Sequence, residues 1–454
     1  MSRVRLAPSV LLALCVGLAA PTAAQAEAPT PPVATLDLDQ AVTRFREESP
    51  TMAILAGRVA EAQATVKLAT AATLPVLAAQ GGYTRNSDQA VISIGTILQN
   101  IADSLPAQIT LDPSLLPPDF IMQPQDQFTA GASLQVPLIQ PQAWADVGAA
   151  KAGRDAVEAT AESRRLQAES GLVKACWLAQ AAQEKVDVTA RGVTTAKAHE
   201  ASTRRRLDAG IGTQLDVLQA QVELARRKSD QVSAVADLDK ARGAIGALLG
   251  IQGPVDVKLP ALDADPAPEE GVPDDHPDLV AAHAAWQATQ RQVASAWWRQ
   301  APTLSGSATV FGSDVQYVTG KKDGWKLSLN LTWVLFDGGA RYGLLDKARA
   351  QRVQAEAQEQ QARLNLDRDA RDAERSLQAA RELLALAQEG SKTAAEAEAT
   401  ATRLYDAGLL NSLDLIDAQQ RHIEADLGLA GVHAQLAAAR SDLAVAHGRS
   451  WEGP

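Results

Sequence analysis

Two short stretches of the chain alternate strictly between apolar and polar residues. In residues 325–335 the large apolar side chains occupy every second position, namely Trp325, Leu327, Leu329, Leu331, Trp333 and Leu335. Residues 128–138 alternate in the same way, whereas the neighbouring stretches 74–84 and 303–312 alternate weakly. Period-two alternation over about ten residues is typical of barrel strands with one face in lipid and one in water. The pattern predicts two β-hairpins, near 74–84 with 127–138 and near 303–312 with 325–336.

Most of the remaining chain has the periodicity of long helices. The predicted helices lie near residues 37–72, 142–207, 214–250, 278–300, 340–405 and 413–447. A helix over 340–405 would be on the order of 100 Å long, well beyond the helices of globular domains. Within it, apolar residues follow the 4-3-4-3 spacing of coiled-coil packing, at Leu366, Ala370, Ala373, Leu377, Ala380, Leu384 and Ala387. An ordinary long coiled coil would show the same seam.

The chain is internally duplicated. Residues 205–221 read RRLDAGIGTQLDVLQAQ and residues 403–419 read RLYDAGLLNSLDLIDAQ, so the same DAG and LD segments recur in each half. Each half has the order helix, strand, loop, strand, long helix, glycine-containing break and helix. We therefore divide the chain into a first repeat at 27–252, an acidic, proline-rich linker at 253–277 and a second repeat at 278–454.

The first residues have the layout of a secretion signal. Arg3 and Arg5 precede an apolar run over 6–20, and Ala24-Gln25-Ala26 supplies small residues at the cleavage positions. The run is shorter than the roughly 20 residues that a membrane-spanning helix needs. Residues 1–26 are thus predicted to be a signal peptide. Cys15 lies in a poor lipidation context, because Leu14 stands where a small residue is expected.

Composition and charge narrow the function further. The net charge is -11 and only 4% of residues are aromatic, which favours helical bundles and argues against a nucleic-acid partner. Cys176 is the only thiol outside the signal peptide, so it can form no intrachain disulfide, and its pattern predicts a buried core thiol. The histidines are scattered, and neither a nucleotide-binding loop nor a nucleophile motif is present. We expect no enzyme activity, no cofactor and no metal site.

The predicted strands cannot close on themselves. Two hairpins give four strands, whereas membrane barrels need at least about eight. Open sheet edges do not occur in lipid, so strands in a membrane would require several chains to associate. The alternative is that both hairpins pack on helices in a soluble domain.

The signal peptide, the duplication, both hairpins and the paired DAG and LD segments together resemble the TolC outer-membrane efflux family. The resemblance covers nearly all of the chain after the signal peptide. It implies a mostly α fold with a small β part, in which each chain of a homotrimer gives four strands to one twelve-stranded transmembrane barrel and its helices line a periplasmic tunnel. It further implies a passive exit duct in the outer membrane that works with a periplasmic adaptor and an inner-membrane transporter in efflux or type I secretion.

The resemblance also assigns roles to particular residues. Gly210 and Gly408 match the turns at the periplasmic tips where the adaptor docks. Asp414 and Asp417, three residues apart on one helix face, match acidic residues that ring the tunnel entrance. Tyr405 and Asp216 match a pair that latches the closed entrance.

Two further features complete these expectations. The arginine partner of the family's latch falls on Leu410, which puts the strength of this gate in doubt. Trp325 and Trp333 are expected in the aromatic girdles of the membrane strand.

Two points stay open at this stage. The first external loop, 86–126, is about forty residues long, and its isoleucines would suit a cap, a partner site or filler, while its prolines argue against long regular structure. A soluble periplasmic coiled-coil adaptor or structural protein is the main alternative function, since it would share the secretion signal and the heptads. The transported substrate cannot be read from these residues.

Overall fold

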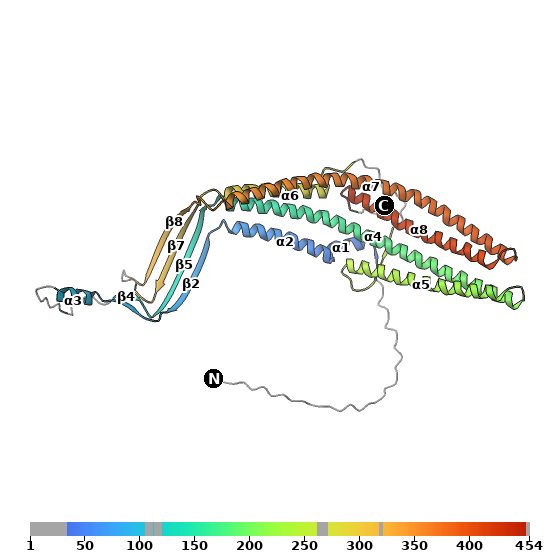
Figure 1. The fold of residues 1–454 in the computed structure, drawn as a ribbon, viewed down its shortest axis with the longest axis horizontal. Helices are drawn as coiled ribbons and strands as arrows, with labels where there is room; N and C mark the ends of the chain where they lie inside the picture. Colours follow the sequence, from blue (N-terminus) through green and yellow to red (C-terminus); the bar gives the residue numbers. More distant parts are fainter. Residues whose placement is uncertain (1–33, 105–111, 113–119, 261–270, 317–320, 451–454) are drawn as a thin grey trace, which may run out of the picture.

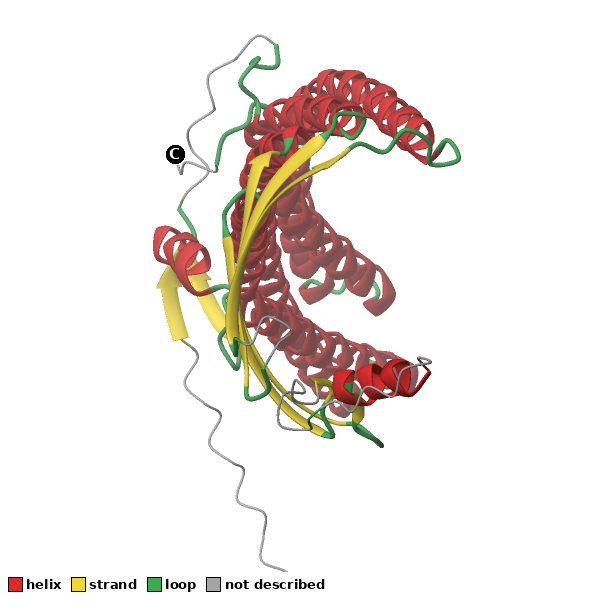
Figure 2. Ribbon diagram, turned by 90° about the vertical axis from the view of Figure 1, so that its left-hand side faces the viewer, coloured by secondary structure: helices red, strands yellow, loops and turns green. Residues whose placement is uncertain are grey.

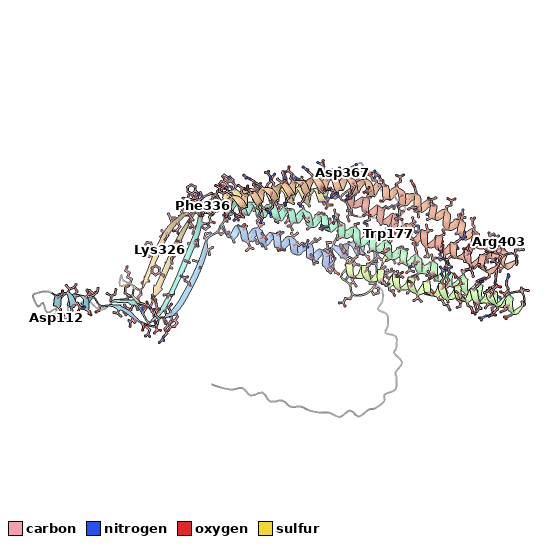
Figure 3. All side chains as sticks on the ribbon, viewed as in Figure 1. Asp112, Trp177, Lys326, Phe336, Asp367 and Arg403 are labelled. Atoms are coloured by element: carbon pink, nitrogen blue, oxygen red, sulfur yellow. The ribbon has the colours of Figure 1, made fainter. Side chains whose placement is uncertain are left out.

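The computed structural model describes residues 34–104, 112, 120–260, 271–316 and 321–450. These residues form a long rod of helices that ends in a four-stranded sheet (Figure 1). In Figure 3, Lys326 lies in the sheet, Phe336 where the sheet meets the helices, and Arg403 near the far tip. The predicted signal peptide and Cys15 fall outside the described residues.

The helices and strands follow the predicted order. In chain order they are β1 (Ala34–Asp37), α1 (Leu38–Glu48), α2 (Pro50–Ala71), β2 (Val76–Arg85), β3 (Ala90–Ile92), α3 (Ile94–Ser104), β4 (Phe120–Gln123), β5 (Asp126–Ile139), α4 (Pro141–Asp208), α5 (Gln214–Leu248), β6 (Val255–Lys258), α6 (Pro277–Trp298), β7 (Thr303–Ser313), β8 (Asp323–Thr332), α7 (Ala340–Asp406) and α8 (Ser412–Ala446). The mostly α fold with a small β part is confirmed.

One predicted helix is in fact two. The stretch near 37–72 is broken at Ser49, whose extended backbone ends α1 and caps α2. The Ser49 hydroxyl accepts a hydrogen bond from the Thr51 N–H at 3.1 Å, and Pro50 occupies the first position of α2. A proline disfavours helical geometry in the residue before it and donates no hydrogen bond to the preceding turn, so the helix restarts there.

The coiled-coil seam is confirmed from Leu366 to Ala380. Leu366, Ala370, Ala373, Leu377 and Ala380 are all buried, whereas Leu384 and Ala387 are half-buried. Ala370 and Ala373 form one cluster with α8, Leu377 and Ala380 form another, and Leu443 of that helix contacts both clusters. Small alanines at these positions let the two long helices approach closely.

The four-stranded sheet is antiparallel, with the strand order β2-β5-β7-β8. Its register lines up the apolar positions of all four strands, for example Leu77 with Leu134, Leu134 with Ala308, and Ala308 with Leu327. On β5, β7 and β8 the adjacent row is polar, with Ser133 opposite Thr309 and Thr309 opposite Lys326. On β2 this row continues with Ala78, so the second face of that strand is mixed. The sheet therefore has one apolar face shared by all four strands and an opposite face that is mostly polar on β5, β7 and β8.

The predicted end of the last strand, at residue 336, is wrong. The stretch 325–336 stops being a strand at Thr332, which pairs with Thr303, the first residue of β7. Pro302 precedes that residue and has no N–H to donate, so the ladder ends and Trp333 lies just beyond it.

Two small pieces of structure had no predicted counterpart. β1 pairs in parallel with β6, which lies inside the stretch assigned to the linker. The long loop 86–126 contains the β3–β4 hairpin and the helix α3. Pro124, the one loop proline among the described residues, lies outside these elements.

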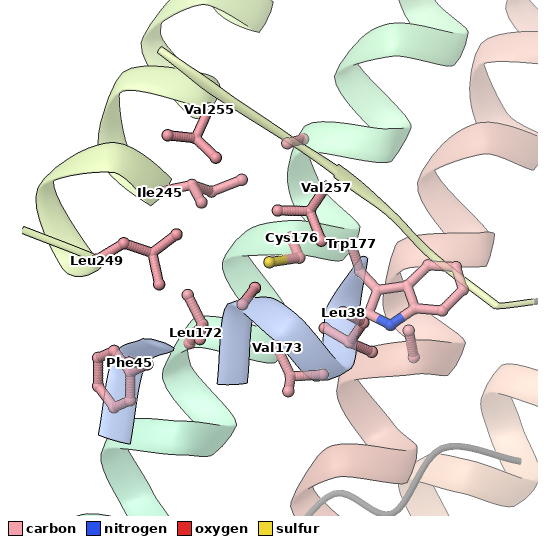
Figure 4. Packing of buried hydrophobic residues seen from close by; sticks show 13 residues of the cluster. Leu38, Phe45, Leu172, Val173, Cys176, Trp177, Ile245, Leu249, Val255 and Val257 are labelled. Atoms are coloured by element: carbon pink, nitrogen blue, oxygen red, sulfur yellow. The ribbon is translucent and has the colours of Figure 1, made fainter. Parts of the chain in front are cut away.

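The largest apolar core lies halfway along the helices, where α1, α4, α5 and β6 meet (Figure 4). Phe45, Leu172 and Ile245 are fully buried there. Cys176 is 1% exposed, which confirms the predicted core thiol, and burial raises the pKa of this thiol to about 12. A thiol with so high a pKa is unreactive at neutral pH.

Next to this core, a buried carboxylate on α4 accepts hydrogen bonds from two side chains that are about 400 residues apart in the sequence. Glu169, 1% exposed, accepts hydrogen bonds from Arg46 Nε at 2.8 Å, Arg46 Nη2 at 2.9 Å and Ser450 Oγ at 2.7 Å. Burial opposes its ionisation, but these hydrogen bonds and the charges of Arg165 and Arg46 outweigh burial and lower the pKa of Glu169.

We expect Glu169→Gln to destabilise the helical body by about 3 kcal/mol, because it leaves Arg46 and Arg165 with an uncharged partner. A carboxylate with a lowered pKa stabilises the fold above its ordinary pKa of about 4.3, and this contribution is lost as the pH falls through the folded-state value. Thermal melting of the purified protein should show a larger difference between wild type and variant at pH 7 than at pH 3. Glu162→Gln, which removes an exposed partner of Arg165, is the control and should change the Tm little.

Candidate functional site

The helix pairs α4–α5 and α7–α8 both reverse direction at the end of the rod farthest from the sheet (Figure 1). The predicted turn residues Gly210 and Gly408 lie at these reversals with φ values of +78° and +75°. At the first turn, Ile211 N–H donates to Arg206 O at 3.0 Å and Gly210 N–H donates to Leu207 O at 2.9 Å. The second turn repeats this pattern. This is the Schellman arrangement, which needs a left-handed residue and so favours glycine.

The helices that leave the two turns begin with capped N-termini. Thr213 and Asp216 form a capping box in which Thr213 N–H donates to Asp216 Oδ2 at 3.0 Å and Asp216 N–H donates to Thr213 Oγ1 at 3.2 Å. In the second turn, Asn411 Oδ1 accepts from Asp414 N–H at 2.8 Å. The hydrogen bonds of Asp216 therefore cap the N-terminus of its own helix, α5.

An arginine that sequence reasoning did not single out connects the two turns. Arg206, at the end of α4, donates from Nη2 to Tyr405 O and, at 3.2 Å, to Asp406 O at the end of α7. Its guanidinium lies 4.2 Å from the centroid of the Tyr405 ring. Carbonyls at a helix C-terminus have no partner in their own helix and carry partial negative charge, so this cation is well placed. Arg206 stands in a run of three arginines, and the sequence does not distinguish it from its neighbours.

Tyr405 and Leu410 belong to a small apolar cluster beneath this contact. Tyr405 and Leu415 are buried, and Leu410 packs against them. Leu410, which the resemblance aligns with an arginine of a latch, is therefore an apolar side chain in this cluster, while Arg206 supplies a positive charge at the turn.

A buried histidine completes the packing between the two helix pairs. His199 of α4 is 5% exposed, and its Nε2 lies 2.9 Å from the Ser412 hydroxyl at the start of α8. Its ring packs edge-on against Tyr405, with centroids 5.1 Å apart. Burial lowers the pKa of His199, although the nearby Asp216 acts in the opposite direction. Protonation at acid pH therefore weakens this contact.

The predicted acidic residues lie on two sides of this region. Asp414 and Asp216 line an open pocket of about 500 Å³ together with Arg206 and Tyr405. Asp417 faces a different groove and forms an ion pair with Arg421 at 3.0 Å. Both Asp414 and Asp417 are exposed on α8. One chain therefore brings Asp216, Tyr405 and Asp414 to one pocket and leaves Asp417 outside it.

The apolar face of the sheet is the second candidate site. Trp325, Leu327, Leu329 and Leu331 on β8 are each more than 70% exposed. Trp333, past the strand end, is 60% exposed, and its Nε1 donates to Gln300 O at 3.2 Å. Such a continuous, uncovered apolar surface is unusual for a soluble domain and marks an interaction surface.

Among the described residues, no group of three or more His, Cys, Asp or Glu side chains could hold a metal ion. The helices in the described ranges also include none that is both long and apolar enough to pass through a bilayer.

Seen from the sheet end, the sheet and the helices curve together into an arc (Figure 2). A model of the outer membrane efflux protein family matches residues 41–251 and 274–449, which are most of the chain and include both tips and both hairpins. The chain belongs to the outer membrane efflux protein family. It is an outer-membrane exit duct of tripartite efflux systems, and a soluble adaptor is not favoured.

Individual known proteins are also similar to this chain. The cobalt-zinc-cadmium resistance protein CzcC of Cupriavidus metallidurans is 27% identical over 318 residues, which are 68% of this chain and 74% of that protein. The outer membrane protein VceC of Vibrio cholerae has a TM-score of 0.72 at 19% identity, covering 91% of this chain and 97% of VceC. CusC has a TM-score of 0.75 at 16% identity, covering 94% and 96%. These structures share the fold of this outer-membrane efflux chain.

Proposed function

We propose that three copies of this chain form one tube across the outer membrane and the periplasm. The sheet carries this proposal. Its apolar face is exposed on all four strands, and its outer strands β2 and β8 pair on one side only within the described residues. Unpaired edges are excluded from lipid, so β2 of one copy would pair with β8 of the next until the barrel closes. Four strands from each of three chains give the twelve strands of this family's barrel.

The helical arc supports the same assembly. α4 has 68 residues and α7 has 67, so each is on the order of 100 Å long. Three arcs of this kind, side by side, would enclose a tunnel in the periplasm. We infer that the tips around Gly210 and Gly408 dock a periplasmic adaptor, which joins the duct to an inner-membrane transporter.

The tip pocket is the proposed entrance gate. Arg206 and His199 connect the α4–α5 pair to the α7–α8 pair in one chain, so opening the entrance requires these contacts to break. Tyr405 and Asp216 line the same pocket, which is consistent with a role for both in the gate.

We expect the purified protein to form a cation-preferring pore in planar bilayers. Asp414 and Asp417, present in each of three chains, would give two rings of carboxylates at the entrance, and such rings attract cations. The Asp414→Asn, Asp417→Asn double variant should lower the cation preference, measured as the reversal potential in a salt gradient. It should also weaken the block by Zn²⁺ or Co²⁺, the kind of cation named for CzcC.

Asp230→Asn, Asp239→Asn is the matched control, because it removes the same charge from α5. Equal selectivity of the double variant and wild type would refute the rings, while the absence of any pore would refute the channel.

A further inference from the structure

The long external loop continues the sheet away from the helices. Past the end of β2, Asn86 N–H donates to Gln125 O at 2.7 Å and Asn86 Nδ2 donates to Pro124 O at 2.8 Å. The β3–β4 hairpin follows, with Ala90 paired to Gln123, and carries α3 at the extreme end of the molecule (Figure 1). β2 alone has ten residues, enough for a tilted strand to cross a bilayer. In the membrane orientation of the proposed channel, α3 lies beyond the outer surface.

One face of α3 is apolar and uncovered. Ile94, Ile97, Leu98 and Ile101 follow the i, i+3, i+4, i+7 spacing of a single helix stripe and are 40–53% exposed. The buried residues of this helix are Gly95 and Ala102, which lie to one side of the stripe. Thr96, Gln99 and Asp103 lie on the opposite face. The exposed stripe is therefore a different face of the helix from the one on which these small residues are buried.

We propose that the stripes of α3 from the three copies pack against one another over the outer mouth of the barrel and narrow it when the duct is at rest. This inference rests on the proposed trimer. Because α3 is carried by the hairpin of β2, an edge strand that would pair with the next copy, threefold symmetry brings three α3 helices to one ring. The proposed intersubunit interface along β2 is then continuous with the contact of the stripes.

The charge of the loop favours a second copy of the chain, rather than a membrane surface, as the partner of the apolar stripe. Helices that lie on anionic membranes carry Lys and Arg on their polar face. Residues 86–125 contain Asp88, Asp103, Asp112 and Asp119 and no Lys, Arg or His. In the proposed contact Asp103 would point away from the stripe and stay in water, so three copies could meet without burying like charges.

Disulfide trapping tests this proposal in the full-length protein in outer membranes. Ile97→Cys should give mostly cross-linked dimers on mild oxidation, at least fivefold more than Thr96→Cys on the opposite face. Cys176 does not interfere, since it is buried in the core. No dimer from Ile97→Cys, or equal dimer from both variants, would overturn the contact, and the stripe would then lie on lipid or stay in water.

Conductance supplies the functional arm. In an Arg206→Ala background, in which the inner end is expected to be open, Ile97→Asp, Ile101→Asp should raise the mean single-channel conductance at least twofold, because three charged stripes cannot pack, while Thr96→Asp, Gln99→Asp should leave it unchanged. Equal conductance of both variants and of Arg206→Ala alone would overturn the narrowing of the outer mouth. A protein that runs as a monomer in mild detergent would instead refute the trimer itself.

Discussion

Arg206→Ala is expected to leave the duct open at its inner end. The substitution removes two hydrogen bonds to the last carbonyls of α7 and the contact with the Tyr405 ring. Among the described residues, no other side chain of the first turn donates hydrogen bonds to these carbonyls. A charge-assisted hydrogen bond contributes about 1.5–3 kcal/mol, so a loss of about 2 kcal/mol in each chain shifts the closed-to-open equilibrium about thirtyfold. Planar-bilayer recordings should show a severalfold higher mean conductance, and cells should become sensitive to bulky antibiotics that normally stay outside.

The neighbouring arginine provides a matched control. Arg205 precedes Arg206 on the same helix turn, is exposed, and its removal changes the net charge equally. Arg205→Ala should behave like wild type, and Arg206→Lys should be intermediate, because lysine keeps the charge but cannot bond two carbonyls and cover a ring at once. If both alanine variants opened the pore equally, the effect would be one of charge, and the latch assignment would fail.

Elements that repeat a simple pattern could be predicted from sequence. The long helices and the seam from Leu366 to Ala380 follow from heptad spacing, and the turns at Gly210 and Gly408 follow from the duplicated segments. β8 was visible because Trp325, Leu327 and Leu329 alternate with polar residues. The helix and strand signals can each be read from a single stretch of sequence, and the turns from a comparison of two matching stretches.

What the sequence did not reveal depends on contacts between distant segments. β2 alternates poorly, and its apolar face appears only when Leu77 is aligned with Leu134. Arg206 gained its role because α4 and α7 end side by side, about two hundred residues apart in sequence. The expectation that Leu410 weakens the gate considered one position alone, whereas the structure places a cation at the same turn from the other repeat. α3 was missed because it is only 11 residues long and the prolines that follow it in the loop argued against regular structure.

Leu329→Arg is expected to abolish membrane assembly. Leu329 is 72% exposed at the middle of β8, on the apolar face of the sheet. An arginine on the lipid side of a barrel strand costs about 2–4 kcal/mol near the bilayer midplane, and a trimer would bear this cost three times. Fractionation should find the variant degraded or in the soluble fraction, with little oligomer in the outer membrane.

Ser328→Arg separates this reason from a general effect of a bulky charge. Ser328 is the adjacent residue, pairs with Ser307 and lies on the polar face, which already carries Lys326. A water-filled lumen accepts an arginine there, so this variant should assemble normally and alter only ion selectivity. Normal assembly of Leu329→Arg would mean that the apolar face is not in lipid, and an equal defect in both variants would mean that the strand tolerates no large residue. Either outcome would remove the reason for placing the sheet in the membrane, because that placement depends on the two faces of β8 having different solvents.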